Sequence, residues 1–230
     1  MLKVWLILSG VLGLLGSTVV FAAPSLKLAE RVLQVRGVDA DGRLFFGSAV
    51  VVEPGWAATN CHVVRTGGLI RLSLGHEVYA VTEERVDEYA DLCLLHAPAL
   101  KIPPVKRVSA SQLARGVAMG YYGYPRGLGL SYAEGVLKRV VTHSQLPLIE
   151  TSAFFTLGGS GGGLFDSQGR LIGLATFMTR GHAGGYFGIG SDQIGRVRKR
   201  PAQPITALHG QAFWEQTGFE LGPENKRPGR

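Results

Sequence analysis

Short apolar stretches, rich in Val, Ile, Leu and aromatic residues, recur along the chain between Gly, Pro and polar turns. They cover residues 31–36, 44–52, 69–74, 91–95, 116–122, 134–141, 146–150, 162–166, 170–177 and 185–190. Strand-length stretches with such frequent turn signals are typical of a β-sandwich or β-barrel. Helical periodicity is weak, so we expect one helical turn within 58–64 and a short helix over 191–200 with Ser191 as its N-cap. The pattern predicts an all-β fold with a short C-terminal helix.

Residues 1–22 have the pattern of an export signal and are set apart from the fold. One early cation, Lys3, precedes an apolar run that ends in small residues, and Val20 and Ala22 fit the −3 and −1 positions of a signal-peptidase site. Cleavage there would start the mature chain at Ala23. An uncleaved membrane anchor is the alternative, because the run approaches the roughly 20 residues that a membrane span needs. In both cases the remainder is exported, into a periplasm or out of the cell.

Composition indicates a globular protein with a basic surface. Of the 230 residues, 46% are hydrophobic and 18% are charged, and the formal net charge is +7. The positive charge gathers at 196–200 and 226–230, without interleaved aromatic residues or a nucleic-acid-binding motif. We therefore expect a solvated basic end and no nucleic-acid partner, with binding to an anionic surface as an additional hypothesis. The strand pattern fades after residue 200, so 201–230 is expected to be an extension whose end, 223–230, is disordered.

A single serine, Ser160, lies among five glycines in the segment G-G-S-G-G-G-L, residues 158–164. Glycine loses the most backbone freedom on folding, so this many glycines in an ordered segment need a structural reason. A flexible linker does not fit, because expected strands flank the cluster directly. Acyl transfer needs two backbone N–H groups aimed at one point, and a glycine-rich turn can supply them. We expect the amides of Gly158 and Ser160 to form such an oxyanion hole.

A serine hydroxyl becomes a nucleophile only when a base takes its proton and the base itself is held in orientation. His62, in G-W-A-A-T-N-C-H-V-V, follows an apolar stretch directly, where a strand-to-turn junction would fix its backbone. Asp91 opens the buried run D-L-C-L-L, where a carboxylate is costly unless it is hydrogen-bonded or paired. His62 and Asp91 are therefore the candidate base and orienting carboxylate for Ser160.

Three segments in this order, T-N-C-H-V-V, A-D-L-C-L-L and G-G-S-G-G-G-L, resemble the three signatures of chymotrypsin-like serine proteases. The closest likeness is to the bacterial trypsin-like branch that contains the high-temperature-requirement proteases. Residues 47–60 resemble that branch's strand pair before the histidine, and 123–128 with 131–137 resemble its Gly-x-Pro loop and next strand. The similarity runs from about residue 30 to 197.

The resemblance implies two packed six-stranded antiparallel β-barrels within a protease domain spanning 23–200, with their boundary near 103–115. The active site would lie in the cleft between the barrels. It implies that His62 is the general base and acid, Asp91 its orienting carboxylate and Ser160 the nucleophile. It implies no cofactor and no metal.

Some residues depart from the family pattern. Gly159 stands where proteases activated from zymogens carry an aspartate, so we expect activity without N-terminal activation. Gly163 stands where the family usually has proline. Only some thirty residues follow Arg200, too few for the PDZ domains common in this group.

By the same resemblance, a pocket holds the substrate residue before the scissile bond. Its expected lining is Phe154, Phe155, Thr176, Phe177, Met178 and Gly185. No carboxylate stands at its base, so we expect small or medium apolar side chains rather than Lys or Arg. The alternative is that the two phenylalanines point into the barrel core.

The two cysteines, Cys61 and Cys93, each lie beside a candidate catalytic residue. An even count in an exported protein suggests a disulfide, and Cys93 shares a strand face with Asp91, which brings it near Cys61 if Asp91 reaches His62. Two buried free thiols are an alternative. A metal site with His62 and His96 is a poor one, because Cys93 and His96 would face opposite sides of a strand.

We therefore predict an exported serine endopeptidase that acts on protein or peptide substrates through an acyl-enzyme. A catalytically inactive protease-fold binding module is the alternative, supported only by the altered surroundings of Gly159 and Gly163. Contact with a membrane is expected only if the signal segment is uncleaved. The sequence gives no expectation for the oligomeric state.

Overall fold

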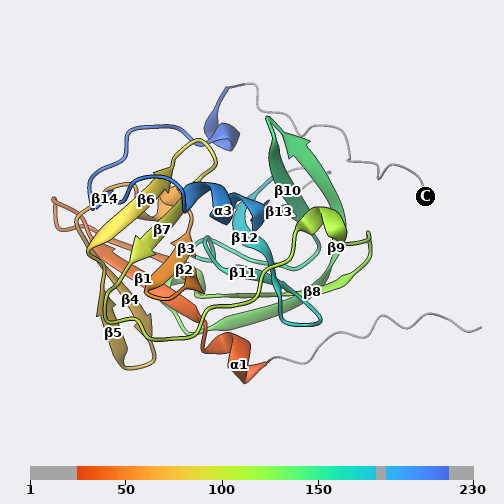
Figure 1. Ribbon diagram of the computed structural model, residues 1–230, viewed down its shortest axis with the longest axis horizontal. Helices are drawn as coiled ribbons and strands as arrows, with labels where there is room; N and C mark the ends of the chain where they lie inside the picture. The colour runs from red at the N-terminus through yellow and green to blue at the C-terminus, as the bar shows by residue number, and fades with distance from the viewer. Residues whose placement is uncertain (1–24, 180–184, 218–230) are drawn as a thin grey trace, which may run out of the picture.

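The structure is a computed structural model, in which residues 25–179 and 185–217 are described. Two β-sheet halves lie side by side, with the first half at the left of Figure 1 and the second at the right. The first half contains α1 (Leu26–Ala29), β1 (Val32–Val38), β2 (Leu44–Glu53), β3 (Trp56–Thr59), α2 (Cys61–Val64), β4 (Leu69–Leu74), β5 (Glu77–Ala80), β6 (Glu83–Asp87) and β7 (Leu92–His96). The second contains η1 (Ala110–Gln112), β8 (Ala118–Gly123), η2 (Pro125–Gly127), β9 (Ser131–His143), β10 (Leu146–Thr151), β11 (Gly163–Asp166), β12 (Leu171–Met178), β13 (Tyr186–Gly190) and α3 (Asp192–Val197).

The first half is an eight-stranded sheet in the order β14-β6-β7-β3-β2-β1-β4-β5, where β14 (Gln203–Pro204) comes from the C-terminal extension. Its strands pair antiparallel, as in the β1–β2 hairpin, which joins Val35 to Gly47. One face buries an apolar cluster that includes Leu33, Val51 and Leu72. The other face of β1 and β2 is buried too, because successive side chains along a strand point to opposite faces and Val32, Val50 and Val52 belong to a different apolar cluster.

The second half is a closed barrel in the order β10-β13-β12-β11-β8-β9. One apolar cluster lies within this half and the linker that precedes it, and includes Tyr121, Leu137 and Ile172. Another cluster joins the two halves, with Val50 from the sheet and Phe165 from the barrel. Because this shared cluster buries apolar surface from both halves, it fixes the junction at which the candidate residues meet.

The predicted all-β fold with two packed halves and a short helix is confirmed, with differences in detail. The first half is an open, curled eight-stranded sheet rather than a closed six-stranded barrel. Sequence reasoning missed β5 and β6, since β5 is only four residues long and mostly exposed, and β6 is mostly polar. The helix over 191–200 forms as α3, but Ser191 does not cap it, because its buried hydroxyl donates to the Val108 carbonyl instead (2.9 Å).

The C-terminal extension is ordered further than its fading pattern indicates. Its residues 201–217 run back from α3 to β14 on the edge of β6, then return toward the junction of the halves (Figure 1). Leu208 and Phe213 are buried, and a short 3₁₀ helix, η3, covers Phe213–Glu215. The apolar residues of this segment have no regular spacing, so periodicity could not reveal them. The predicted disordered end lies outside the described residues.

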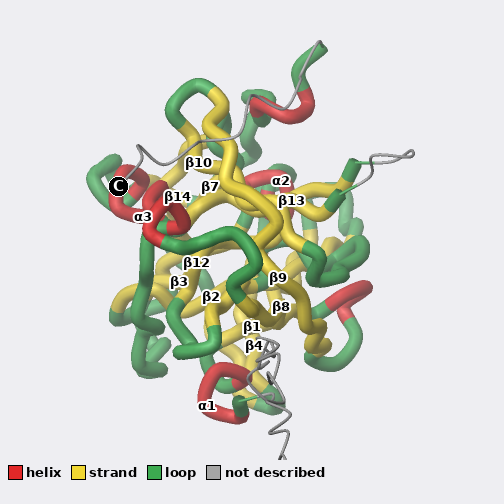
Figure 2. The backbone as a smooth tube through the Cα atoms, turned by 90° about the vertical axis from the view of Figure 1, so that its right-hand side faces the viewer, coloured by secondary structure: helices red, strands yellow, loops and turns green. Residues whose placement is uncertain are grey.

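Helices form only a small part of the fold, and α1 and α2 lie far apart (Figure 2). Figure 2 shows α1 at the lower end of the molecule and α2 near the upper end. No helix within 25–179 or 185–217 has the length and apolar character that crossing a bilayer requires. The predicted signal segment, 1–22, lies outside these ranges.

Candidate active site

His62 and Asp91 meet within the first half, where two hydrogen bonds join them. His62 is the second residue of α2, directly after β3, and Asp91 ends the turn that leads into β7. The His62 Nδ1 atom lies 2.7 Å from Asp91 Oδ2, and the His62 amide donates to Asp91 Oδ1 at 2.9 Å. An ionised carboxylate only accepts hydrogen bonds, so Nδ1 carries the proton and Nε2 is left free to accept one.

The Asp91 carboxylate is completely buried yet hydrogen-bonded on both oxygens. A third donor, the indole Nε1 of Trp214, reaches Oδ2 at 3.0 Å. The Asp91 backbone adopts φ 52°, a left-handed conformation that Asp tolerates better than most residues. These three donors compensate the burial of the charge, as the sequence required of a carboxylate at this position.

Ser160 lies on the loop between β10 and β11, at the edge of the second half. Its carbonyl accepts from the Ser48 amide of β2 at 2.9 Å, which ties the loop to the first half. Its Oγ donates to the Thr176 carbonyl at 3.3 Å. Ser160 is half-buried and the His62 side chain is 22% exposed, so both remain open to a reactant.

Asn60 joins the loop of Ser160 to Asp91, and sequence reasoning missed it. This completely buried side chain accepts from the Gly161 amide at 2.7 Å. Its Nδ2 donates to the Asp91 carbonyl at 2.8 Å and to Thr176 Oγ1 at 3.1 Å. One side-chain amide therefore links the backbone of Asp91, the partner of His62, to the backbone of Gly161, which follows Ser160. The signal available in the sequence was its place two residues before His62.

The backbone carbonyl groups of residues 157–160 all accept hydrogen bonds. The Leu157 carbonyl accepts from the Arg126 amide at 2.9 Å, and the Gly158 carbonyl accepts from Ser48 Oγ at 3.2 Å. The Gly159 carbonyl accepts from the Gly162 amide at 3.0 Å. Among the described residues, the amides of Gly158 and Ser160 have no acceptor. They are the two amides expected to form an oxyanion hole.

Gly159, which stands where related zymogens have aspartate, is packed too tightly for a side chain. A Cβ there would lie 2.5 Å from the Tyr121 hydroxyl, which itself donates to the Gly159 carbonyl at 3.2 Å. Tyr121 is buried, and burial raises the pKa of its phenol, so the hydroxyl keeps its proton as a donor. The loop is therefore supported by a tyrosine of β8 in place of an acidic side chain at 159.

The two phenylalanines expected in the substrate pocket point in different directions. Phe154 is 56% exposed and packs its edge against Tyr186, whereas Phe155 is buried with Tyr121 and Tyr186. The core interpretation thus describes Phe155 but not Phe154. Phe177 is buried as well, stacked on Phe187 at 5.1 Å.

The other expected pocket residues follow the β12–β13 edge. Met178 is 38% exposed, Thr176 is buried beside Asn60, and the Gly185 amide donates to Thr179 Oγ1 at 2.9 Å. Met178 pairs with Tyr186 across the β12–β13 ladder. Of the expected pocket residues, Phe154 and Met178 are apolar and exposed, and Leu157, three residues before Ser160, is exposed as well.

Cys61 and Cys93 form the disulfide considered from the sequence, with a Cα–Cα distance of 5.0 Å. It joins α2 to β7, so it links the two elements that present His62 and Asp91. The cysteines are thus neither free thiols nor metal ligands in this structure. Within the described ranges, no group of three or more His, Cys, Asp or Glu side chains has a metal-binding arrangement.

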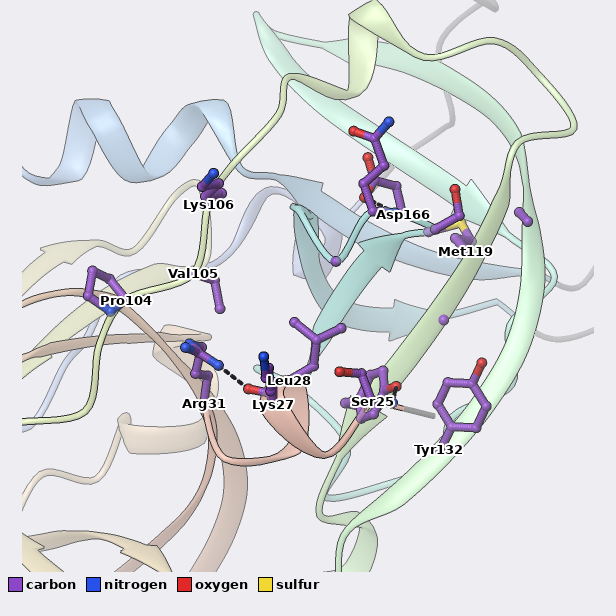
Figure 3. Close-up of a pocket in the computed structure, with 16 residues that line it drawn as sticks. Ser25, Lys27, Leu28, Arg31, Pro104, Val105, Lys106, Met119, Tyr132 and Asp166 are labelled. Atoms are coloured by element: carbon purple, nitrogen blue, oxygen red, sulfur yellow. Dashed lines mark hydrogen bonds between the residues drawn. The ribbon is translucent and has the colours of Figure 1, made fainter. Parts of the chain in front are cut away.

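A cavity of about 650 Å³ lies beside α1, with none of the candidate catalytic residues in its lining. Figure 3 shows its walls, which include Lys27, Arg31 and Lys106 on one side and Tyr132 on another. The Arg31 side chain donates to the Lys27 carbonyl and so is held within this wall. Because α1 and α2 lie toward opposite ends in Figure 2, the cavity is separate from the site of His62.

Several known proteins with similar sequences are named serine endoproteases. The family model described as a trypsin-like peptidase domain matches residues 47–174. A protein of Chlamydia trachomatis named "Probable periplasmic serine endoprotease DegP-like" is 32% identical over 178 residues, covering 74% of this chain and 34% of its own. "Serine endoprotease DegS" of Haemophilus influenzae is 27% identical over 138 residues, covering 56% of this chain and 41% of its own. The chain thus spans about a third of the length of these curated relatives.

Solved structures share the fold. The active form of the Rv3671c protease from M. tuberculosis superposes with a TM-score of 0.72 at 20% identity, covering 86% of this chain and 98% of its own. The HtrA-type protease AlgW with a tripeptide superposes with a TM-score of 0.69 at 23% identity, covering 75% and 60%. The chain therefore belongs to the trypsin-like peptidase family.

Proposed function

We propose that the chain is a serine endopeptidase in which Ser160 is the nucleophile, His62 the general base and acid, and Asp91 the orienting carboxylate. The observation that carries this proposal is the 2.7 Å contact between His62 Nδ1 and Asp91 Oδ2. Asn60 supports it, since its side chain bonds both the Asp91 carbonyl and the Gly161 amide next to the nucleophile. Membership of the trypsin-like peptidase family supports peptide-bond hydrolysis as the class of reaction.

The proposed reaction proceeds through an acyl-enzyme. Ser160 Oγ attacks the scissile carbonyl carbon while its proton passes to His62 Nε2. The tetrahedral intermediate then collapses, the C–N bond breaks, and His62 returns the proton to the leaving amine. Water attacks the ester in the same way, with His62 as base, and the acid product leaves with Ser160 restored. Asp91 stays ionised throughout and stabilises the imidazolium that forms twice in the cycle.

The oxyanion of each intermediate is proposed to bind the amides of Gly158 and Ser160. This assignment is supported by their lack of an acceptor within the described ranges, while the carbonyls of 157–160 are held by Ser48, Arg126 and the loop itself. Two preorganised donors are already directed before charge develops, so little reorganisation is needed during the reaction. This is the chemical use of the glycine cluster.

Substrates are proposed to be proteins or peptides with an apolar residue before the scissile bond. The solved neighbours include an HtrA-type protease with a tripeptide and one with a decapeptide. Here Phe154 and Met178 from the expected pocket and Leu157 from the loop of Ser160 are apolar and exposed. An apolar rim of this kind favours burial of an apolar side chain over that of Lys or Arg.

The enzyme is proposed to act outside the cytoplasm and without zymogen activation. Export is supported by the signal pattern of residues 1–22 and by the word periplasmic in the names of the DegP-like relatives. Activity without a new N-terminus is supported by Gly159, because Tyr121 supports the loop that an aspartate would otherwise anchor. The domain proposed to carry the activity spans 23–200.

A fluorophosphonate probe tests the proposal on the purified chain. Its phosphorus would bond Ser160 Oγ with loss of fluoride, so we expect one label per wild-type chain and none in Ser160→Ala or His62→Ala. Cleavage of a peptide library by the same preparation then reports the residue preferred before the scissile bond. A folded wild-type chain that takes no label between pH 6 and 9 would instead support a non-catalytic binding module.

A further inference from the structure

Trp214, from the C-terminal extension, touches both members of the His62–Asp91 pair. Its indole Nε1 donates to Asp91 Oδ2 at 3.0 Å, the same oxygen that lies 2.7 Å from His62 Nδ1. Its ring meets the His62 imidazole edge to face, with centroids 5.4 Å apart and planes at 86°. No pattern around Trp214 in the sequence indicated this contact, which spans 123 residues from Asp91.

Several contacts hold Trp214 in this position. The indole also stacks on Phe177 of β12, with centroids 5.5 Å apart and planes at 14°. Next to it, Glu215 accepts from both terminal nitrogens of Arg65 in a bidentate ion pair, at 2.8 and 2.5 Å. Phe213, on its other side, is buried, and its amide donates to the Tyr89 carbonyl at 3.0 Å. The indole is therefore fixed from both halves of the molecule.

Four of the ionisable groups around this position form two pairs, and His143 lies nearby against Phe213. Asp91 and His62 form one pair, and Glu215 and Arg65 form the other. The hydrogen bond from Arg65 lowers the pKa of Glu215, so Glu215 stays ionised near neutral pH. The Glu88 carboxylate lies on the same turn as Asp91 and accepts from the Gly210 amide of the extension. None of these groups donates to Asp91 Oδ2, so the indole N–H is its one donor besides His62 in the described part of the chain.

We propose that Trp214 is a positioning residue, whose indole N–H fixes the Asp91 carboxylate and thereby the orientation and proton affinity of His62. The N–H withdraws negative charge from the oxygen that faces His62, so it limits how strongly the carboxylate stabilises the imidazolium. It also leaves Asp91 one orientation in which both oxygens are satisfied. The catalytic part of this inference rests on the proposed function, whereas the geometric part does not.

Replacing Trp214 by phenylalanine removes the N–H donor and keeps an aromatic ring against Phe177 and His62. Trp56→Phe is the matched control, because Trp56 lies at the start of β3 and stacks on His96 rather than on the triad. Proton NMR of the full chain, in a Ser160→Ala background, follows the His62 ring as pH changes and needs no activity. We expect the midpoint of the His62 titration to rise by about one pH unit in the Trp214→Phe chain and to stay in the Trp56→Phe chain.

Kinetics on the active chain provide the second readout. We expect kcat to fall about tenfold in the Trp214→Phe variant, with KM little changed and the acid limb of the kcat/KM profile displaced upward in pH. An unchanged His62 titration in Trp214→Phe, with an unfolding curve like that of the control, would overturn the inference. A shifted titration in a chain that never takes a fluorophosphonate label would leave the positioning role standing and refute the proposed function.

Discussion

At the scale of single residues, the loop that carries Ser160 contains two glycines whose surroundings leave no space for a side chain. Gly158 adopts φ +83°, and a Cβ there would lie 2.4 Å from the Arg126 amide nitrogen. Gly161 adopts φ +81°, and a Cβ there would meet the Ser48 carbonyl oxygen at 2.0 Å. Both the backbone conformation and the close approach therefore require glycine, which explains why the sequence concentrates glycines around one serine.

Gly158→Ala should damage the oxyanion hole more than it damages the fold. The new methyl group pushes against the Arg126 amide and turns the 157–158 peptide, so one of two oxyanion donors is displaced. We expect kcat to fall by about 10²-fold or more, as when an oxyanion donor is removed elsewhere. The measurement is steady-state hydrolysis of a peptide substrate.

Gly195→Ala is the control for that substitution. Gly195 lies in α3, has an ordinary φ, and a Cβ there meets nothing within 4 Å. Its activity should equal the wild-type value. Equal activity of the Gly158→Ala chain would contradict the assignment of this amide.

At the scale of elements, the disulfide joins α2 to β7, and β6 pairs with β7 on its other side. Cys61 precedes His62, and Cys93 follows Asp91 by two residues, so one covalent bond spans the elements that carry the pair. On the outer side of β7, β6 carries the completely buried Glu84, which is covered by the extension. The disulfide stabilises the folded chain, whereas a charge on the buried Glu84 destabilises it.

Removing the disulfide should destabilise the chain without changing its fold. For a sequence separation of 32 residues, chain entropy predicts a loss of about 3.7 kcal/mol in the free energy of unfolding. Urea unfolding of the Cys61→Ala/Cys93→Ala double variant measures it. Reductant should lower the wild-type midpoint and leave that of the double variant alone; a wild-type curve unaffected by reductant would show that the bond is absent in solution.

Glu84→Gln should stabilise the chain, and by an amount that depends on pH. Burial raises the pKa of Glu84, and its Oε2 has no hydrogen-bond partner among the described residues. A raised pKa favours the protonated form in the folded state. The stability this gives is therefore present below the unfolded value and is lost as pH rises through the folded one. The uncharged glutamine avoids that loss.

The measurement is thermal unfolding of wild type and Glu84→Gln at pH 4 and at pH 7.5, from which the change in the free energy of unfolding is obtained. We expect the variant to gain about 1 kcal/mol at pH 7.5 and almost nothing at pH 4. A gain of the same size at both values would mean that charge on Glu84 is not its source.

At the scale of the whole molecule, three bodies meet at the candidate site. The sheet supplies His62 and Asp91, the barrel supplies Ser160, and residues 201–217 pass over their junction (Figure 1). Phe213 belongs to the apolar cluster that joins the two halves, and Leu208 belongs to the cluster of the sheet. The extension is thus part of the folded core rather than an appendage.

Ending the chain at Arg200 should therefore cost stability, whereas ending it at Thr217 should not. Loss of the buried Leu208 and Phe213 side chains exposes their partners, and at about 2 kcal/mol for each the free energy of unfolding falls by about 4 kcal/mol. Urea unfolding of chains 23–200 and 23–217 makes the comparison. Coincident curves for the two would contradict a structural role for the extension.

Local chemistry in the sequence was enough to place most strands and to single out three residues as candidates for catalysis. The stretches 44–52, 69–74 and 170–177 became β2, β4 and β12 almost unchanged, because alternating apolar residues bury one face of a strand and continuous apolar residues bury both. A lone serine among glycines and a carboxylate opening a buried run are costly on their own, so their presence indicated chemistry before any geometry was known.

Tertiary structure alone decided the contacts that complete the site. Ser48, Asn60 and Trp214 act through partners more than a hundred residues away, or through several partners at once, and no periodicity records such pairs. The open sheet of the first half was likewise decided by which edges meet, not by which segments are strands. The chemistry of each residue determines its tendency to be buried and to form local hydrogen bonds. The convergence of distant groups depends instead on how the completed elements pack.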